Sequence, residues 1–193
     1  MVRSGNRNVV RLLRLQVFLY ILLPFAAVWT LAVHGQDYSS RVRRGQEDRA
    51  FRTLTHSKIF NLGGFGFALA VSPEERAFRV LLNSENPGGL FRRLLREANP
   101  EGQLFGLYGL YLEDREAFKA EVDRLKHDDG PPERWDGMIF IEKGKIRSAE
   151  GCIIFRPDRP KLIEKMATGG FDQAFQAVTN RLAQSRNPQP LKY

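Results

Sequence analysis

Three dipeptides that each end in proline constrain the fold of this chain more than any other feature. They are Ser72-Pro73, Asn86-Pro87 and Asn99-Pro100, spaced 14 and then 13 residues apart. Proline lacks the amide hydrogen that is unpaired at the first helical position, and the residue before proline is kept out of the helical region. Serine or asparagine there accepts a hydrogen bond from a first-turn amide. Each dipeptide therefore predicts a helix start, and Glu75 predicts a capping box in the first.

The spacing predicts four short helices, over residues 74–84, 88–98, 101–112 and 114–127. Asp114 is the expected cap of the fourth, which carries Phe118, Val122 and Leu125 on one face. Short helices with tight connections fold back on one another as antiparallel hairpins. The sequence therefore predicts a helical core in this part of the chain.

The third of these helices keeps three glycines, Gly102, Gly106 and Gly109, in its most apolar part. Each glycine costs about 1 kcal/mol relative to alanine in a helix interior. Large apolar residues surround the helix on all sides, so we interpret the glycines as points where a neighbouring backbone packs closely. Leucine at position 106 should then be excluded, whereas alanine should be tolerated. Tyr108 and Tyr111 on the same helix are candidates for an interaction surface.

The N-terminal 35 residues read as a membrane-targeting segment. Arg11 and Arg14 precede an uncharged run from Val17 to Val33 that includes Trp29 near its end. The 17 residues of this run exceed the usual core of a signal peptide and match the shortest membrane spans. We favour a retained single-pass anchor with arginines at the headgroups, and the alternative is cleavage after Gly35.

The remaining chain divides into a polar juxtamembrane stalk over residues 36–58, a single domain over 59–185 and a loose tail over 186–193. The net charge is +8, but residues 1–35 hold four arginines and no acid, which leaves 26 basic and 22 acidic residues. Mixed charge of this kind is typical of solvated helix faces, so nucleic acid is not an expected partner. A basic tail before an apolar run is the usual export layout, so residues 36–193 are expected outside the cytoplasm.

After a Gly/Pro-rich connector the pattern changes to short apolar runs, residues 138–141 and 152–155, with turn signals at Gly144 and Gly151. These runs predict strands covered on both faces, arranged as a small antiparallel meander. Two C-terminal helices follow, the first ended by Gly169. The fold class expected is α+β, mainly α.

No residue pattern in the sequence points strongly to catalysis or to a cofactor. The three histidines are far apart and lack metal-ligand spacing. Cys152 precedes two isoleucines and is expected in the core, although a histidine brought near it would make it a nucleophile. The Gly63-Gly64-Phe65-Gly66 stretch lacks the rest of a phosphate-binding motif, so a buried glycine-rich strand or loop is expected there.

The segments "EGQLFGLYGLYLED" and "EGCIIF" resemble a functionally unassigned group of exported bacterial proteins, over roughly Phe60 to Phe155. The helical part is also loosely similar to HEAT-type hairpins. In the group an Asp-Pro pair often splits the helical pair, where this chain has Asp114-Arg115. The resemblance implies a bacterial envelope setting and no particular chemistry.

The function expected is a membrane-tethered helical interaction module that binds another envelope protein, in addition to membrane lipid through the N-terminal helix. Two alternatives remain open: a small-molecule or lipid-binding domain that uses the surface around Tyr108 and Tyr111, and a hydrolase-like enzyme centred on Cys152. Oligomeric state does not follow from the sequence.

Overall fold

The computed structural model describes residues 41–66, 68 and 70–186 of the 193-residue chain. The anchor residues expected from sequence, Arg11, Arg14, Val17, Trp29 and Val33, lie outside the described residues, as does the tail from 187 onward. No helix in the described ranges combines the length and apolar character that a membrane span needs. The folded unit begins at Gln46.

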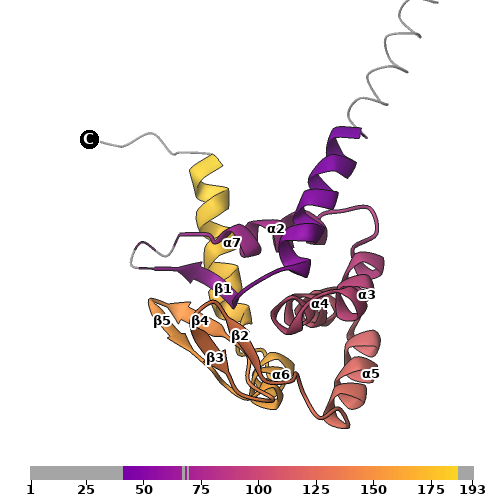
Figure 1. Cartoon of the computed structure of the whole chain (residues 1–193). Helices are drawn as coiled ribbons and strands as arrows, with labels where there is room; N and C mark the ends of the chain where they lie inside the picture. The colour runs from indigo at the N-terminus through magenta and orange to yellow at the C-terminus, as the bar shows by residue number, and fades with distance from the viewer. Residues whose placement is uncertain (1–40, 67, 69, 187–193) are drawn as a thin grey trace, which may run out of the picture. The chain divides into compact units, whose positions relative to one another are not determined.

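The fold is α+β and mainly helical, as the sequence predicts (Figure 1). A helix over residues 41–55 is followed by β1 (Phe60–Phe65), α2 (Pro73–Leu82), α3 (Pro87–Glu97), α4 (Pro100–Glu113) and α5 (Arg115–Lys126). The second part of the chain forms β2 (Arg134–Asp136), β3 (Ile139–Ile141), β4 (Ser148–Gly151), β5 (Ile153–Phe155), α6 (Arg159–Ala167) and α7 (Asp172–Arg186). The last helix, α7, packs against β1, and α4 lies between α3 and α5.

The helix starts are confirmed, each with the expected side-chain cap. Ser72 accepts a hydrogen bond from the Glu75 amide at 3.0 Å, and Asn99 accepts one from the Gly102 amide at 2.9 Å. Asn86 caps α3 in the same way. Asp114 separates α4 from α5 and accepts from the amide of the third residue of α5. The break between these two helices therefore needs no proline.

The predicted capping box at Glu75 is wrong, because the glutamate carboxylate turns away from the cap. The side chain is fully buried and accepts hydrogen bonds from the amides of Gly63 and Gly64, at 3.2 and 3.1 Å. The guanidinium of Arg79 pairs with the same carboxylate at 2.7 Å. Both glycines have positive φ, +93° and +96°, which turns successive amides toward one anion. The glycine-rich stretch thus holds the chain's own carboxylate.

Helix α4 is the centre of the core and is buried on nearly all sides. A Cβ at Gly102 would overlap the carbonyl oxygen of Leu54, and one at Gly109 would overlap the ring of Phe91. At Gly106 an added Cβ would lie 2.9 Å from the Phe91 carbonyl oxygen. All three glycines thus lie where neighbouring residues approach α4 closely. The expectation that alanine is tolerated at 106 does not fit this geometry, because the 2.9 Å neighbour is backbone and cannot move freely.

The polar stalk expected over residues 36–58 is helical over 41–55, and part of it belongs to the core. Ala50, Phe51 and Leu54 are buried at 5%, 7% and 0% exposure. These three residues share one helical face, which the arginines on the other faces obscure in the sequence. The domain therefore starts at about Gln46, not at 59.

The predicted antiparallel meander is also wrong in its connections. β2 and β3 form a separate antiparallel hairpin, whereas β4 lies between β1 and β5 in a three-stranded sheet. β1 pairs parallel with β4, and β4 pairs antiparallel with β5. The turn at Gly144 leads from one sheet to the other because β4 pairs with a strand far away in the sequence. The strands are also not covered on both faces: Met138, Ile153 and Ile154 are 97%, 69% and 47% exposed.

The C-terminal helices follow the prediction. α6 ends just before Gly169, which has φ +76°. α7 docks through Phe175 and Val178, which are buried, whereas Leu182 on the same face is 37% exposed.

Candidate interaction surface

The β2–β3 hairpin presents an apolar face to solvent. Trp135 pairs with Phe140 across the two strands, with ring centroids 5.3 Å apart, and a two-residue loop containing Met138 joins the strands. Their exposed fractions are 71% for Trp135, 41% for Phe140 and 97% for Met138. We call these three residues the hairpin surface. Large apolar side chains gathered at such exposure are typical of interaction sites.

Strand alternation fixes which side chains face outward. Successive residues of a strand point to opposite faces, so Trp135 and Phe140 share one face, and their neighbours share the other. On the inner face Ile141 is 1% exposed, and Arg134 and Asp136 are half-buried. The inner face therefore attaches the hairpin to the rest of the unit.

Charged contacts hold the inner face in place. Arg134 forms a close ion pair with Glu101 of α4, whose side chain is 3% exposed. The same Glu101 carboxylate accepts a hydrogen bond from the backbone amide of Arg147 at 3.1 Å. The Arg147 guanidinium in turn donates to Asp136 at 2.7 Å, and the Lys58 ammonium lies 3.7 Å from that carboxylate. The hairpin is thus tied both to α4 and to the residue that precedes β4.

A polar pocket of about 280 Å³ adjoins the hairpin surface. Trp135 and Ile141 line it together with residues 56–58 and 99–101. Its charged side chains, Lys58 and Arg134 against Glu101 and Asp136, balance one another. An apolar surface beside a charge-balanced polar recess suits a protein partner with a mixed surface, and it offers no excess charge for a polyanion.

Tyr108 and Tyr111 do not form the surface expected from the sequence. They are 0% and 3% exposed, since α4 is covered by its neighbouring helices. Their hydroxyls donate to the two oxygens of Asp172 at the start of α7, at 3.2 and 2.8 Å. Burial, together with the Asp172 carboxylate, raises the pKa of Tyr108. The two tyrosines fasten α7 to α4.

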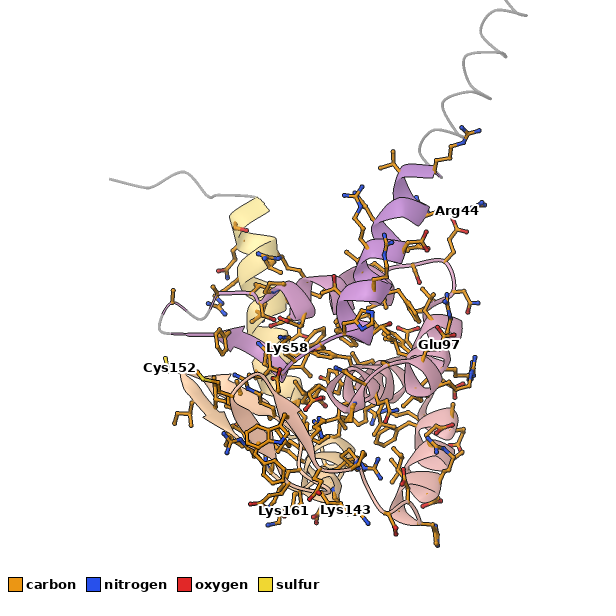
Figure 2. The ribbon with its side chains drawn as sticks, viewed as in Figure 1. Arg44, Lys58, Glu97, Lys143, Cys152 and Lys161 are labelled. Carbon is orange, nitrogen blue, oxygen red and sulfur yellow. The ribbon has the colours of Figure 1, made fainter. Side chains whose placement is uncertain are left out.

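Cys152 is exposed, which corrects its expected place in the core. It is the single residue between β4 and β5, next to the last cross-strand pair of Glu150 with Ile153, and its side chain extends past the ends of the strands (Figure 2). His56 lines the polar pocket, and His127 ends α5 with Nδ1 2.8 Å from the Asp123 carbonyl oxygen. Neither of these histidines forms a hydrogen bond with Cys152 in the described part of the chain. Over the same residues, no group of three or more His, Cys, Asp or Glu side chains is placed to hold a metal.

The sequence-based prediction missed the hairpin surface because it placed Trp135 and Asp136 in the Gly/Pro-rich connector. The sequence nevertheless contains one indication of a hairpin at this point. Gly137 is the first residue of the two-residue loop, with φ +64°, and glycine at this position favours a tight hairpin. The alternation of Trp135 with Arg134 and Asp136 would then have placed the tryptophan on the opposite face of a strand from these two charged residues.

The comparisons with known proteins give no match to this chain: no protein-family model, curated protein or solved structure is significantly similar to it.

Proposed function

We propose that the chain is an interaction module of the bacterial envelope that binds a partner protein through the hairpin surface. The observation that supports this most is the outward alternation of Trp135 and Phe140, with Met138 at the tip, on a ribbon already attached through its other face. A tryptophan exposed on a rigid element is typical of a residue that dominates a protein interface.

The membrane tether and the extracytoplasmic location belong to this proposal and rest on the sequence of residues 1–35. The close packing of α3 on α4 supports the likeness to a HEAT-type hairpin as part of the same proposal.

Neither alternative function gains support from its expected residues. The hypothesis of a small-molecule site placed the binding surface on Tyr108 and Tyr111, which are core residues. The hypothesis of an enzyme needs a base beside Cys152, whereas His56 lines the polar pocket and His127 contacts the Asp123 carbonyl oxygen. The interaction module is therefore the function that the geometry supports best.

Site-specific photo-crosslinking in cells tests the proposal. A photoreactive residue replaces Met138, and a control replaces Lys119, which is exposed on α5. We expect one discrete crosslinked protein from position 138 that disappears with Trp135→Ser, and none from position 119. Equal crosslinking from both positions, or none from 138, would rule out the hairpin surface as the interface.

A further inference from the structure

A second pocket, remote in sequence from the hairpin, lies between β1 and the segment that leads into α2. Its volume is about 330 Å³. Apolar side chains form its walls, and two buried polar residues line it as well: Ile59, Phe65, Val71 and Pro73, with Asn61 and Ser72. A small, mostly apolar pocket with few polar groups is the usual form of a ligand site.

Asn61 is 1% exposed, yet the nitrogen of its side-chain amide, Nδ2, has no hydrogen-bond partner. Its Oδ1 accepts a hydrogen bond from the Ser72 hydroxyl at 3.1 Å. The same hydroxyl accepts from the Glu75 amide at 3.0 Å, so its proton is directed to Asn61. This arrangement leaves Asn61 Nδ2 as a donor without an acceptor among the described residues.

A buried donor without an acceptor lowers the stability of the folded state by about 1–3 kcal/mol, so its presence calls for an explanation. Ser84 Oγ and the Nε atoms of Arg147 and Arg159 are also buried without a partner, but the terminal nitrogens of both arginines form ion pairs. Asn61 has no such compensation for Nδ2, and it alone of these four residues lines this apolar pocket. An acceptor supplied by a ligand would remove the cost.

We propose that this pocket binds a small neutral molecule with an apolar body and a carbonyl group, whose oxygen accepts a hydrogen bond from Asn61 Nδ2. Among the described residues that line the pocket none is basic, and Glu74 adds a carboxylate, so an anion is disfavoured. Because Nδ2 is closed off from solvent, the carbonyl reaches it when a wall side chain moves. Phe65 lines the pocket and is 38% exposed, and it is the side chain that the proposal requires to move. The proposal is independent of the hairpin surface.

Side-chain amide NMR on the full chain in detergent micelles, with ¹⁵N-asparagine, tests this assignment. The probe is 2-nonanone, and the matched ligands are nonane, which lacks an acceptor, and nonanoate, which is charged. We expect 2-nonanone to move the Asn61 amide proton signals downfield and nonane to leave them in place. The exposed Asn180 amide, whose oxygen already accepts from Gln176, serves as the internal control and should not move.

Two variants separate binding from folding. Asn61→Leu should weaken 2-nonanone binding by about fivefold or more, the worth of one hydrogen bond, while nonane binding is unchanged. Val71→Trp keeps Asn61 but fills the pocket, and should abolish the shift. Equal shifts with nonane, tighter binding of nonanoate, no shift with any probe, or unchanged 2-nonanone binding to Asn61→Leu would each overturn the proposal.

Discussion

At the residue scale, close contacts with neighbouring residues explain why α4 carries glycine at three positions. Gly106→Ala places a Cβ 2.9 Å from the backbone oxygen of Phe91, and Gly106→Leu adds three more carbons in the same gap. We expect leucine to lower the free energy of unfolding by about 1–3 kcal/mol or more. Alanine should lower it less, because its better helix propensity offsets part of the clash.

Urea unfolding followed by circular dichroism measures both changes. Gly45→Ala is the matched control, because Gly45 is helical and an added Cβ there meets no atom within 4 Å. It should be neutral or slightly stabilising. If Gly106→Leu behaves like Gly45→Ala, the helices are not tightly packed at that point.

Asp172 is the second residue whose removal has a clear expected effect. Its carboxylate accepts from the hydroxyls of both Tyr108 and Tyr111. Asp172→Ala removes the acceptor that the two tyrosine hydroxyls share. Asp172 itself is exposed, so water replaces part of this contact, and we expect a loss of about 1–3 kcal/mol in the free energy of unfolding. Asp123→Ala, which removes an exposed ion pair on α5, should change it by less than about 1 kcal/mol. Comparable losses in the two variants would refute the role given to Asp172.

At the scale of elements, the helix before β1 is part of the domain. Ala50, Phe51 and Leu54 are buried, and the Leu54 carbonyl oxygen lies where Gly102 leaves room for it. A fragment that starts at Gln46 should therefore unfold cooperatively on heating, and one that starts at Ile59 should not. Near-ultraviolet circular dichroism during a thermal scan distinguishes the two. Cooperative melting of the shorter fragment would show that the helix before β1 is not needed for folding, as the predicted polar stalk implies.

The junction of α5 with α6 carries a pH-dependent contact. Burial raises the pKa of Asp128, but the hydrogen bond and charge of Arg159, together with the Gly130 amide and the charge of Arg124, lower it further than burial raises it, so the net shift is downward. The Nη2 of Arg159 lies 3.1 Å from the carboxylate, and the arginine side chain is 5% exposed. A lowered folded pKa gives stability that is present above the unfolded value of about 3.9 and is lost as the pH falls through the folded pKa.

Asp128→Asn tests this contact. Because the carboxylate is 41% exposed, we expect a loss of about 1 kcal/mol or less at neutral pH. The difference from the unmodified chain should shrink as the pH is lowered below about 4. Denaturant midpoints of both proteins across pH measure it, and a difference that stays constant down to pH 2 would exclude the ion pair as its cause.

At the scale of the whole molecule, the main prediction concerns the tether. Val17 to Val33 rises about 25 Å as a helix, and the leucines before it extend this toward a full span of about 30 Å. We expect the intact chain to stay with membranes after carbonate extraction and to retain residues 1–35. Protease added outside the cytoplasmic membrane should degrade the rest. A soluble protein that begins at Gln36 would show a cleaved signal, and a protected domain would show the opposite orientation.

The sequence by itself determined where the helices from α2 to α5 begin. Ser72, Asn86, Asn99 and Asp114 each accept a hydrogen bond from the amide three residues further on, so their effect follows from local sequence order alone. The same holds for the end of α6 at Gly169, where a positive φ favours glycine.

Only the tertiary structure decided how these elements combine. β4 pairs with β1, from which it is separated by four helices and a hairpin, and such pairing depends on contacts that local pattern does not encode. The same contacts buried Tyr108 beside α7, drew Glu75 to Gly63 and left Cys152 exposed. Trp135 shows the reason: its own strand fixes only that it faces opposite to its neighbours, and what packs on the other face decides which side meets solvent.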